Sequence, residues 1–90
     1  MQDLTNKATL KELQKFPEMF TFKIMGENTN KFVADARKVF DNRHDVTFSE
    51  NISKTGKYIS ISATTEVYTY EELESLYVAI SKLEGLKFHV

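Results

Sequence analysis

The stretch Phe20-Thr21-Phe22-Lys23-Ile24-Met25-Gly26 decides the fold of this chain. Apolar and polar side chains alternate along it, which is typical of a strand that has one face on a hydrophobic core. Phe20, Phe22 and Ile24 are expected to face that core. Gly26 ends the alternation, and we expect it to permit a backbone turn that a side chain would hinder. A helical pattern follows at once, so the stretch is predicted to be the central strand of a small α+β sheet.

The helix after Gly26 is predicted from one apolar stripe, with Asn28 or Thr29 as its N-cap. The stripe consists of Phe32, Val33, Ala36, Val39 and Phe40. A second strand is expected over residues 46–52, with Val46, Phe48 and Ile52 facing inward. Glu50 interrupts its inward face, and a carboxylate there favours an edge strand or a bulge, where it can reach water.

The second half of the chain repeats the alternation of strand and helix. Lys54-Thr55-Gly56-Lys57 predicts a hairpin turn in which Gly56 supplies a positive φ, and residues 58–67 form the longest strand. Thr69 and Glu72 form a capping box at the start of the next helix. The last strand covers residues 86–90. Its inward residues are predicted to be Leu86, Phe88 and Val90, and its outward residues Lys87 and His89.

The predicted order of elements is β-α-β-β-α-β, which is the ferredoxin-like arrangement. We therefore expect an α+β sandwich in which a four-stranded antiparallel sheet carries two helices on one face. In the usual strand order of this fold, 4-1-3-2, the first and third strands are central. Residues 1–17 are predicted to form a short N-terminal lead-in helix, with a Thr9–Glu12 capping box and an end at Pro17, and residues 18–90 a single domain.

Composition narrows the function classes. The chain has 90 residues, a net charge of -1, no cysteine, one proline and three glycines. The charge offers no attraction to nucleic acid or to anionic membranes. No window approaches the ~20 apolar residues of a membrane span, and no signal peptide is visible, so we expect no membrane partner and a cytoplasmic location. The absence of cysteine removes disulfides and thiolate metal sites.

Three segments resemble a known family. Residues 16–26, Phe16-Pro17-Glu18-Met19-Phe20-Thr21-Phe22-Lys23-Ile24-Met25-Gly26, are similar to the Phe-Pro-x-x-Phe-x-x-Lys-Val-Met-Gly signature of the YbeD-like bacterial proteins. Residues 53–62 resemble the Ser-x-Gly-x-Tyr-x-Ser hairpin of that family, with one more residue before the glycine, and Leu76-Tyr77 matches its Leu-Tyr pair. The resemblance implies a ferredoxin-like fold similar to ACT regulatory domains. It brings no catalytic mechanism, because the family is a domain of unknown function.

Four residues are candidates for a ligand site. Gly26, Glu27 and Asn28 lie between the central strand and the following helix, where ACT-like domains present backbone N–H groups to a small ligand and where a helix N-terminus favours anions. Lys23 lies mid-strand and could hold an acidic ligand or partner. The alternatives are structural: Gly26 makes the turn, Asn28 caps the helix, and the stem of Lys23 covers the sheet while its ammonium stays in water.

The sequence thus favours a small non-catalytic binding or regulatory module. Its partner would be a protein or a small anionic metabolite, and we expect the module itself to form a homodimer, for which the exposed edges of the second and last strands offer a pairing route. The other alternative is a nucleic-acid accessory protein that uses the helix-free sheet face, although only Tyr58 on that face could stack on a base. We expect no enzyme, no cofactor and no metal, because no nucleophile, phosphate-binding loop or paired histidines are visible.

Overall fold

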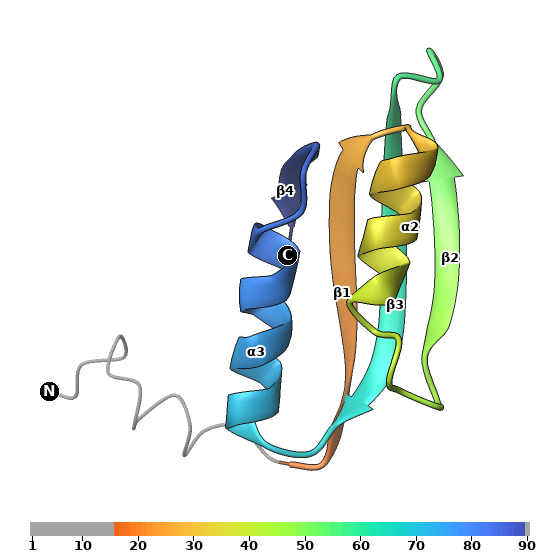
Figure 1. Ribbon diagram of the computed structural model, residues 1–90. Coiled ribbons are helices and arrows are strands. Elements are labelled where there is room, and N and C mark those ends of the chain that lie inside the picture. Colours follow the sequence, from red (N-terminus) through yellow and green to blue (C-terminus); the bar gives the residue numbers. More distant parts are fainter. Residues whose placement is uncertain (1–15, 90) are drawn as a thin grey trace, which may run out of the picture.

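The computed structural model describes residues 16–89. The elements are β1 (Glu18–Glu27), α2 (Asn30–Lys38), β2 (Thr47–Ile52), β3 (Tyr58–Val67), α3 (Tyr70–Ser81) and β4 (Leu86–His89). The strands form one antiparallel sheet in the order β2-β3-β1-β4, and both helices lie on the same face (Figure 1). The ferredoxin-like prediction and its strand order are confirmed. The predicted lead-in helix lies outside the described residues, except for Phe16 and Pro17, which directly precede β1.

The core lies between the sheet and the two helices. Phe22 and Ile24 of β1 and Ile61 and Ala63 of β3 are fully buried, as their alternation predicts. The helices contribute one apolar stripe each, and the turn after α2 contributes one further aromatic ring. The buried residues from this side are Phe32, Ala36, Phe40, Leu73, Leu76 and Ile80.

Hydrogen bonds of Asn28 and Thr29 position the connection between β1 and α2. Thr29 is the N-cap, because its Oγ1 accepts from the backbone N–H of Phe32 at 3.1 Å. Asn28 does not cap the helix but contacts the β2–β3 hairpin. Its backbone N donates to the carbonyl of Lys57, and its Nδ2 donates to the carbonyl of Gly56. Asn28 thus ties the end of β1 to the β2–β3 hairpin, where Gly56 has the expected positive φ of 77°.

Gly26 corrects one prediction. It is a strand residue paired with Ile59 and has no positive φ, so it does not make a turn. A Cβ at Gly26 would lie 2.3 Å from Cζ of Phe32 and 2.7 Å from the carbonyl oxygen of Gly85. The glycine is therefore required by close packing: the Phe32 ring occupies the space that a side chain would fill.

The face assignment at the end of β4 is also corrected. Leu86 lies opposite Gly26, but Phe88 lies opposite the adjacent Met25, so Lys87 is an extra residue in β4. A bulge of this kind reverses which face the following side chains take. Phe88 therefore shares the helix-free face with Met25 and is 54% exposed, whereas His89 turns to the helix side and packs on the Tyr77 ring. The prediction had placed these two residues the other way round.

The edge strand β2 gives one confirmed and one wrong prediction. Glu50 lies on an edge strand, as its charge predicted, and Arg37 of α2 donates to its carboxylate at 2.7 Å while stacking over the ring of Phe48. Ile52 lies opposite the buried Ile59, yet it is 59% exposed. The burial predicted for Ile52 is wrong: it is the last residue of the edge strand β2, and its side chain is not among those that pack against the core.

Candidate functional site

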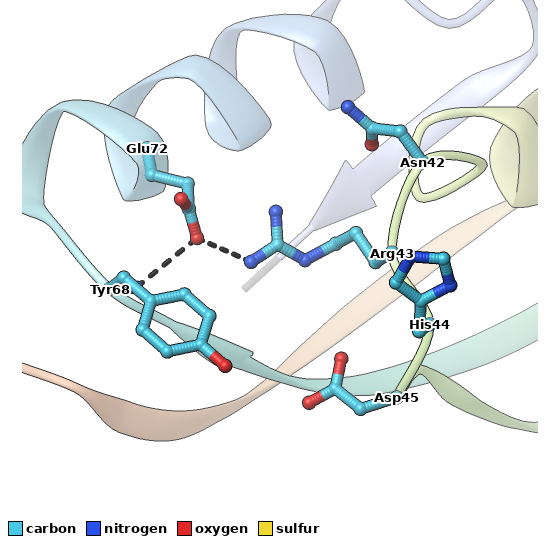
Figure 2. A pocket seen from close by; sticks show the side chains of 6 residues that line it. All are labelled: Asn42, Arg43, His44, Asp45, Tyr68 and Glu72. Carbon is cyan, nitrogen blue, oxygen red and sulfur yellow. Dashed lines mark hydrogen bonds and ion pairs between the residues drawn. The ribbon is translucent and has the colours of Figure 1, made fainter.

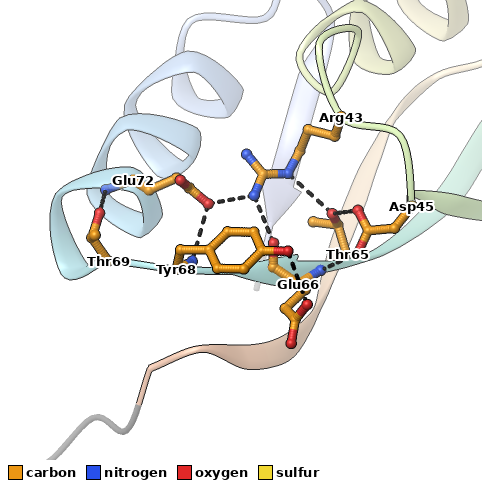
Figure 3. A network of polar contacts seen from close by, with 7 residues as sticks. All are labelled: Arg43, Asp45, Thr65, Glu66, Tyr68, Thr69 and Glu72. Carbon is orange, nitrogen blue, oxygen red and sulfur yellow. Dashed lines mark hydrogen bonds and ion pairs between the residues drawn. The ribbon is translucent and has the colours of Figure 1, made fainter.

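A polar network ties the loop after α2 to β3 and α3 (Figure 3). Arg43 is its centre. Its Nε donates to Oγ1 of Thr65 at 3.0 Å, and its Nη2 donates to the carbonyl of Glu66 at 2.6 Å and to the carboxylate of Glu72. The Arg43 side chain is only 12% exposed. Because these donors meet three acceptors from two elements, Arg43 fixes the position of the loop against the body.

Thr65 and Asp45 extend this network along β3. Thr65 is fully buried, and its hydroxyl donates to Oδ1 of Asp45 at 2.7 Å. The backbone N–H of Glu66 donates to Oδ2 of the same carboxylate at 2.9 Å. These two hydrogen bonds, the one from Thr65 first, lower the pKa of Asp45 below its ordinary value. Asp45 is therefore held as a charged acceptor.

The lowered pKa of Asp45 predicts an acid-dependent loss of stability. A group whose pKa is lower in the folded state stabilises the fold above its unfolded pKa, and this stabilisation is lost as the pH falls through the folded pKa. We expect Asp45→Asn to flatten the dependence of the unfolding midpoint on pH between about pH 5 and pH 2. Urea titrations across that range test this expectation. An equally steep profile in the variant would mean that the stabilisation comes from other carboxylates.

A hollow of about 310 Å³ lies beside the network (Figure 2). Its lining residues are Asn42, Arg43, His44, Asp45, Tyr68 and Glu72. Glu72 also accepts from the backbone N–H of Tyr68 at 3.1 Å, and its own N–H donates to Oγ1 of the N-cap Thr69. Arg43, Asp45 and Glu72 thus already have partners within the fold. We assign this cluster to the fold, and not to a ligand.

The predicted site at the end of β1 is assembled only in part. Gly26 is covered by Phe32, while Glu27 and Asn28 line a pocket of about 530 Å³ together with Thr29, Gly56, Lys57, Tyr58 and Lys87. The first turn of α2 carries no acidic residue, whereas that of α3 carries Glu71 and Glu72. The N-terminus of α2 thus has no acidic residue in its own first turn, and the pocket beside it is lined by Glu27 and by two lysines, Lys57 and Lys87. Lys57 and Lys87 were missed, because they come from the hairpin and from the bulge.

Lys23 lies apart from this pocket. It pairs with Ser62 in the middle of the sheet, on the helix-free face, and its side chain is exposed. The pocket at the end of β1 is lined by other residues. The structure thus separates Lys23 from the three residues with which it was grouped.

A more apolar groove runs along the outer side of α3. Its volume is about 480 Å³. The lining residues are Phe20 of β1, His89 of β4 and, from α3, Tyr70, Leu73, Glu74, Tyr77, Val78 and Ser81. Val78 is 47% exposed there. Nδ1 of His89 is buried and has no hydrogen-bond partner among residues 16–89. Such an atom marks a site where a polar group of another chain or a water is needed.

More than half of one edge of β1 has no paired strand next to this groove within residues 16–89. β3 pairs with all ten residues of β1, Glu18–Glu27, but β4 pairs only with Ile24, Met25 and Gly26. The β4-side edge of residues 18–23 therefore has no strand partner within the described part of the chain. In an antiparallel sheet, alternate residues of such an edge direct their N–H and C=O groups outward. Phe20, in the middle of this unpaired stretch, also lines the groove.

Comparison with known proteins identifies the family. The family model of a "Protein of unknown function (DUF493)" matches residues 11–90. The chain belongs to the DUF493 family. A UPF0250 protein of Haemophilus influenzae (strain PittEE) is 34% identical to this DUF493 chain over 82 residues, covering 89% of each chain. A UPF0250 protein of Buchnera aphidicola subsp. Schizaphis graminum is 37% identical over 83 residues, covering 90% of this chain and 95% of the relative. The YbeD-like resemblance is confirmed.

Solved structures similar to the DUF493 chain agree on its fold. The ACT domain of the GTP pyrophosphokinase of Chlorobium tepidum has a TM-score of 0.65 at 15% identity, over 82% of this chain and 96% of that domain. The solution structure of protein HP0495 of H. pylori has a TM-score of 0.65 at 18% identity, over 99% of this chain and 98% of that one. At these identities the similarity establishes an ACT-like fold.

Two further features of the DUF493 chain bear on the function classes. Neither helix within residues 16–89 is long and apolar enough to cross a membrane. Over the same residues, no group of histidine, aspartate or glutamate side chains is arranged to hold a metal ion.

Proposed function

We propose that this protein is a non-catalytic regulatory module that docks an extended segment of a partner protein along residues 18–23 of β1. The observation that carries the proposal is the combination of an unpaired strand edge with an apolar groove at the same place. An extended peptide that pairs with a sheet edge gains main-chain hydrogen bonds, and its alternate side chains enter neighbouring pockets. Residues 18–23 of β1 offer the unpaired main-chain groups, and the groove along α3 offers a pocket for the side chains.

The groove sets the chemistry of the partner. Its lining includes the aromatic and aliphatic side chains of Phe20, Tyr70, Leu73, Tyr77 and Val78. A strand places every second side chain on one face, so the segment that fits carries apolar residues at alternate positions. The buried Nδ1 of His89 supports occupancy of the groove near β4, because a backbone group of the partner could form a hydrogen bond with it.

A selection with a displayed library of random peptides tests this proposal. Enriched peptides should carry apolar residues at alternate positions, and Val78→Asp should weaken their binding at least about tenfold. Ile52→Asp is the matched control, since Ile52 is similarly exposed but lies on β2, across the sheet. Peptides that bind the Val78→Asp protein as tightly as the unchanged protein, or a selection that enriches none, would contradict the proposal.

A small anionic metabolite in the pocket at the end of β1 is the second candidate. The observation that favours it is the pair Lys57 and Lys87 beside the N-terminus of α2, although Glu27 lines the same pocket. Binding measurements on variants distinguish the two candidates. A ligand held at this pocket depends on Lys57 and Lys87 and is indifferent to Val78→Asp.

A further inference from the structure

The bulge in β4 gives the helix-free face of the sheet a second aromatic ring. Phe88 lies opposite Met25 of β1 on this face and is 54% exposed. Met25 in turn lies opposite Ser60 of β3, and Tyr58 lies two residues before Ser60, so its side chain takes the same face. Both helices lie on the other face (Figure 1). Phe88, Met25 and Tyr58 thus form an aromatic platform, with two rings where the sequence predicted only one.

Three lysines border the aromatic platform. Lys23 of β1 lies on the same face. Nζ of Lys57 lies 5.9 Å from the centre of the Tyr58 ring, and Lys87 lines the pocket at the end of β1 together with Tyr58. All three lysines are exposed, and within residues 16–89 none of them forms an ion pair. Glu27 is the one carboxylate among the residues that line this pocket, so positive charge prevails beside the platform although the chain has a net charge of -1.

The charge and shape of the platform decide which partner fits it. A second copy of this chain fits poorly, because a two-fold contact through this face would bring the lysines of both copies into one interface. An anionic partner is favoured instead, and exposed rings suit flat groups that stack on them. Single-stranded nucleic acid supplies both, since its bases stack on aromatic side chains while basic residues follow its phosphates.

The spacing of the rings favours a strand over a single nucleotide. Two strand spacings separate β4 from β3, so the Cα atoms of Phe88 and Tyr58 are about 10 Å or more apart. One base therefore cannot stack on both rings, whereas two bases of one strand can. A hollow of about 180 Å³ adjoins Tyr58 and is also lined by Asn51 and Ser60, which places polar side chains beside the platform.

We propose that the helix-free face binds single-stranded nucleic acid, with bases stacked on Phe88 and Tyr58 and phosphates held by Lys23, Lys57 and Lys87. This inference does not rest on peptide docking, because the α3 groove lies on the other side of the sheet. It shares two lysines with the pocket at the end of β1, but it differs from that candidate in its dependence on Phe88.

Fluorescence anisotropy of a labelled single-stranded RNA of mixed sequence, titrated with the full chain, tests the proposal. We expect binding at about 50 mM salt that weakens about 20-fold at about 200 mM salt, as roughly three phosphate contacts require. Phe88→Ala should weaken binding at least about fivefold, and Phe88→Tyr should retain it, because the ring provides the stacking. Tyr68→Ala is the matched control: Tyr68 is 56% exposed but follows the opposite end of β3, so RNA binding should not change.

Several outcomes would overturn the proposal. They are the absence of binding at low salt, equal effects of Phe88→Ala and Tyr68→Ala, and competition by polyglutamate as effective as that by unlabelled RNA, which would indicate an acidic protein partner. Competition by a mononucleotide as effective as that by RNA at equal nucleotide concentration would assign the lysines to a small anion instead. Val78→Asp should leave RNA binding unchanged, so failure of the peptide selection and failure of RNA binding are observed separately.

Discussion

Gly26→Ala is expected to lower the free energy of unfolding by about 3 kcal/mol, at the upper end of the usual cost of overpacking a core. The new Cβ would lie 2.3 Å and 2.5 Å from two atoms of the Phe32 ring and 2.7 Å from the backbone oxygen of Gly85. Phe32 is 1% exposed, so its ring has little room to move. Urea denaturation followed by circular dichroism measures the loss.

Two variants show whether packing is the cause. Gly56→Ala meets no atom within 4 Å but has a φ of 77°, so it should cost only about 1 kcal/mol from backbone strain. Phe32→Leu makes room for the Cβ of Gly26→Ala, so the double variant should lose less stability than the sum of the two single variants. A Gly26→Ala protein of normal stability would remove the packing role and return Gly26 to the candidate ligand residues.

Arg43→Ala is expected to cost about 2 kcal/mol, because it removes the donor of three partly buried hydrogen bonds, one of them to a charged carboxylate. The variant leaves the carbonyl of Glu66 and the carboxylate of Glu72 without their donor, and it frees the loop after α2. Thermal and urea unfolding measure this loss. We also expect faster amide exchange in residues 41–46, because the loop is then no longer tied to β3.

Matched variants separate the hydrogen-bonding geometry of Arg43 from its charge. Arg43→Lys keeps the charge but cannot serve Thr65, Glu66 and Glu72 together, so it should recover little of the loss. Lys31→Ala removes an exposed pair with Asp35 and should leave the unfolding midpoint nearly unchanged. Equal effects of Arg43→Ala and Lys31→Ala would contradict the structural role assigned to the Arg43 network.

Alternation and capping predicted most of the fold because they are local signals. The alternating apolar residues of β1 and β3 face the core, and Thr69 caps α3 as the Thr69–Glu72 pair predicted. The errors arose where a non-local contact decides. Gly26 is needed because Phe32 packs on it, and the faces of Phe88 and His89 depend on a bulge that appears only when β4 is aligned with β1.

The candidate site was less predictable for the same reason. Glu27 and Asn28 are adjacent in sequence and do share a pocket, but Lys57 and Lys87 join them from distant segments. The unpaired edge of residues 18–23 follows from a difference in length between β1 and β4, and this difference has no local signature. The sequence shows Arg43 only as a charged residue in a polar loop. Its role depends on Thr65 and Glu72, which are distant in sequence and contact it only in the folded chain.

Amide hydrogen exchange across residues 18–23, measured by NMR with and without a selected peptide, tests the central claim most directly. Docking of an extended segment on this edge predicts that alternate amides of the stretch become protected while the amides of β2 do not change. N-methylation of one set of alternate residues in the peptide should abolish this protection, and N-methylation of the other set should not. Protection at Asn30 and Lys31 instead, with residues 18–23 unchanged, would contradict the account and place the ligand at the N-terminus of α2.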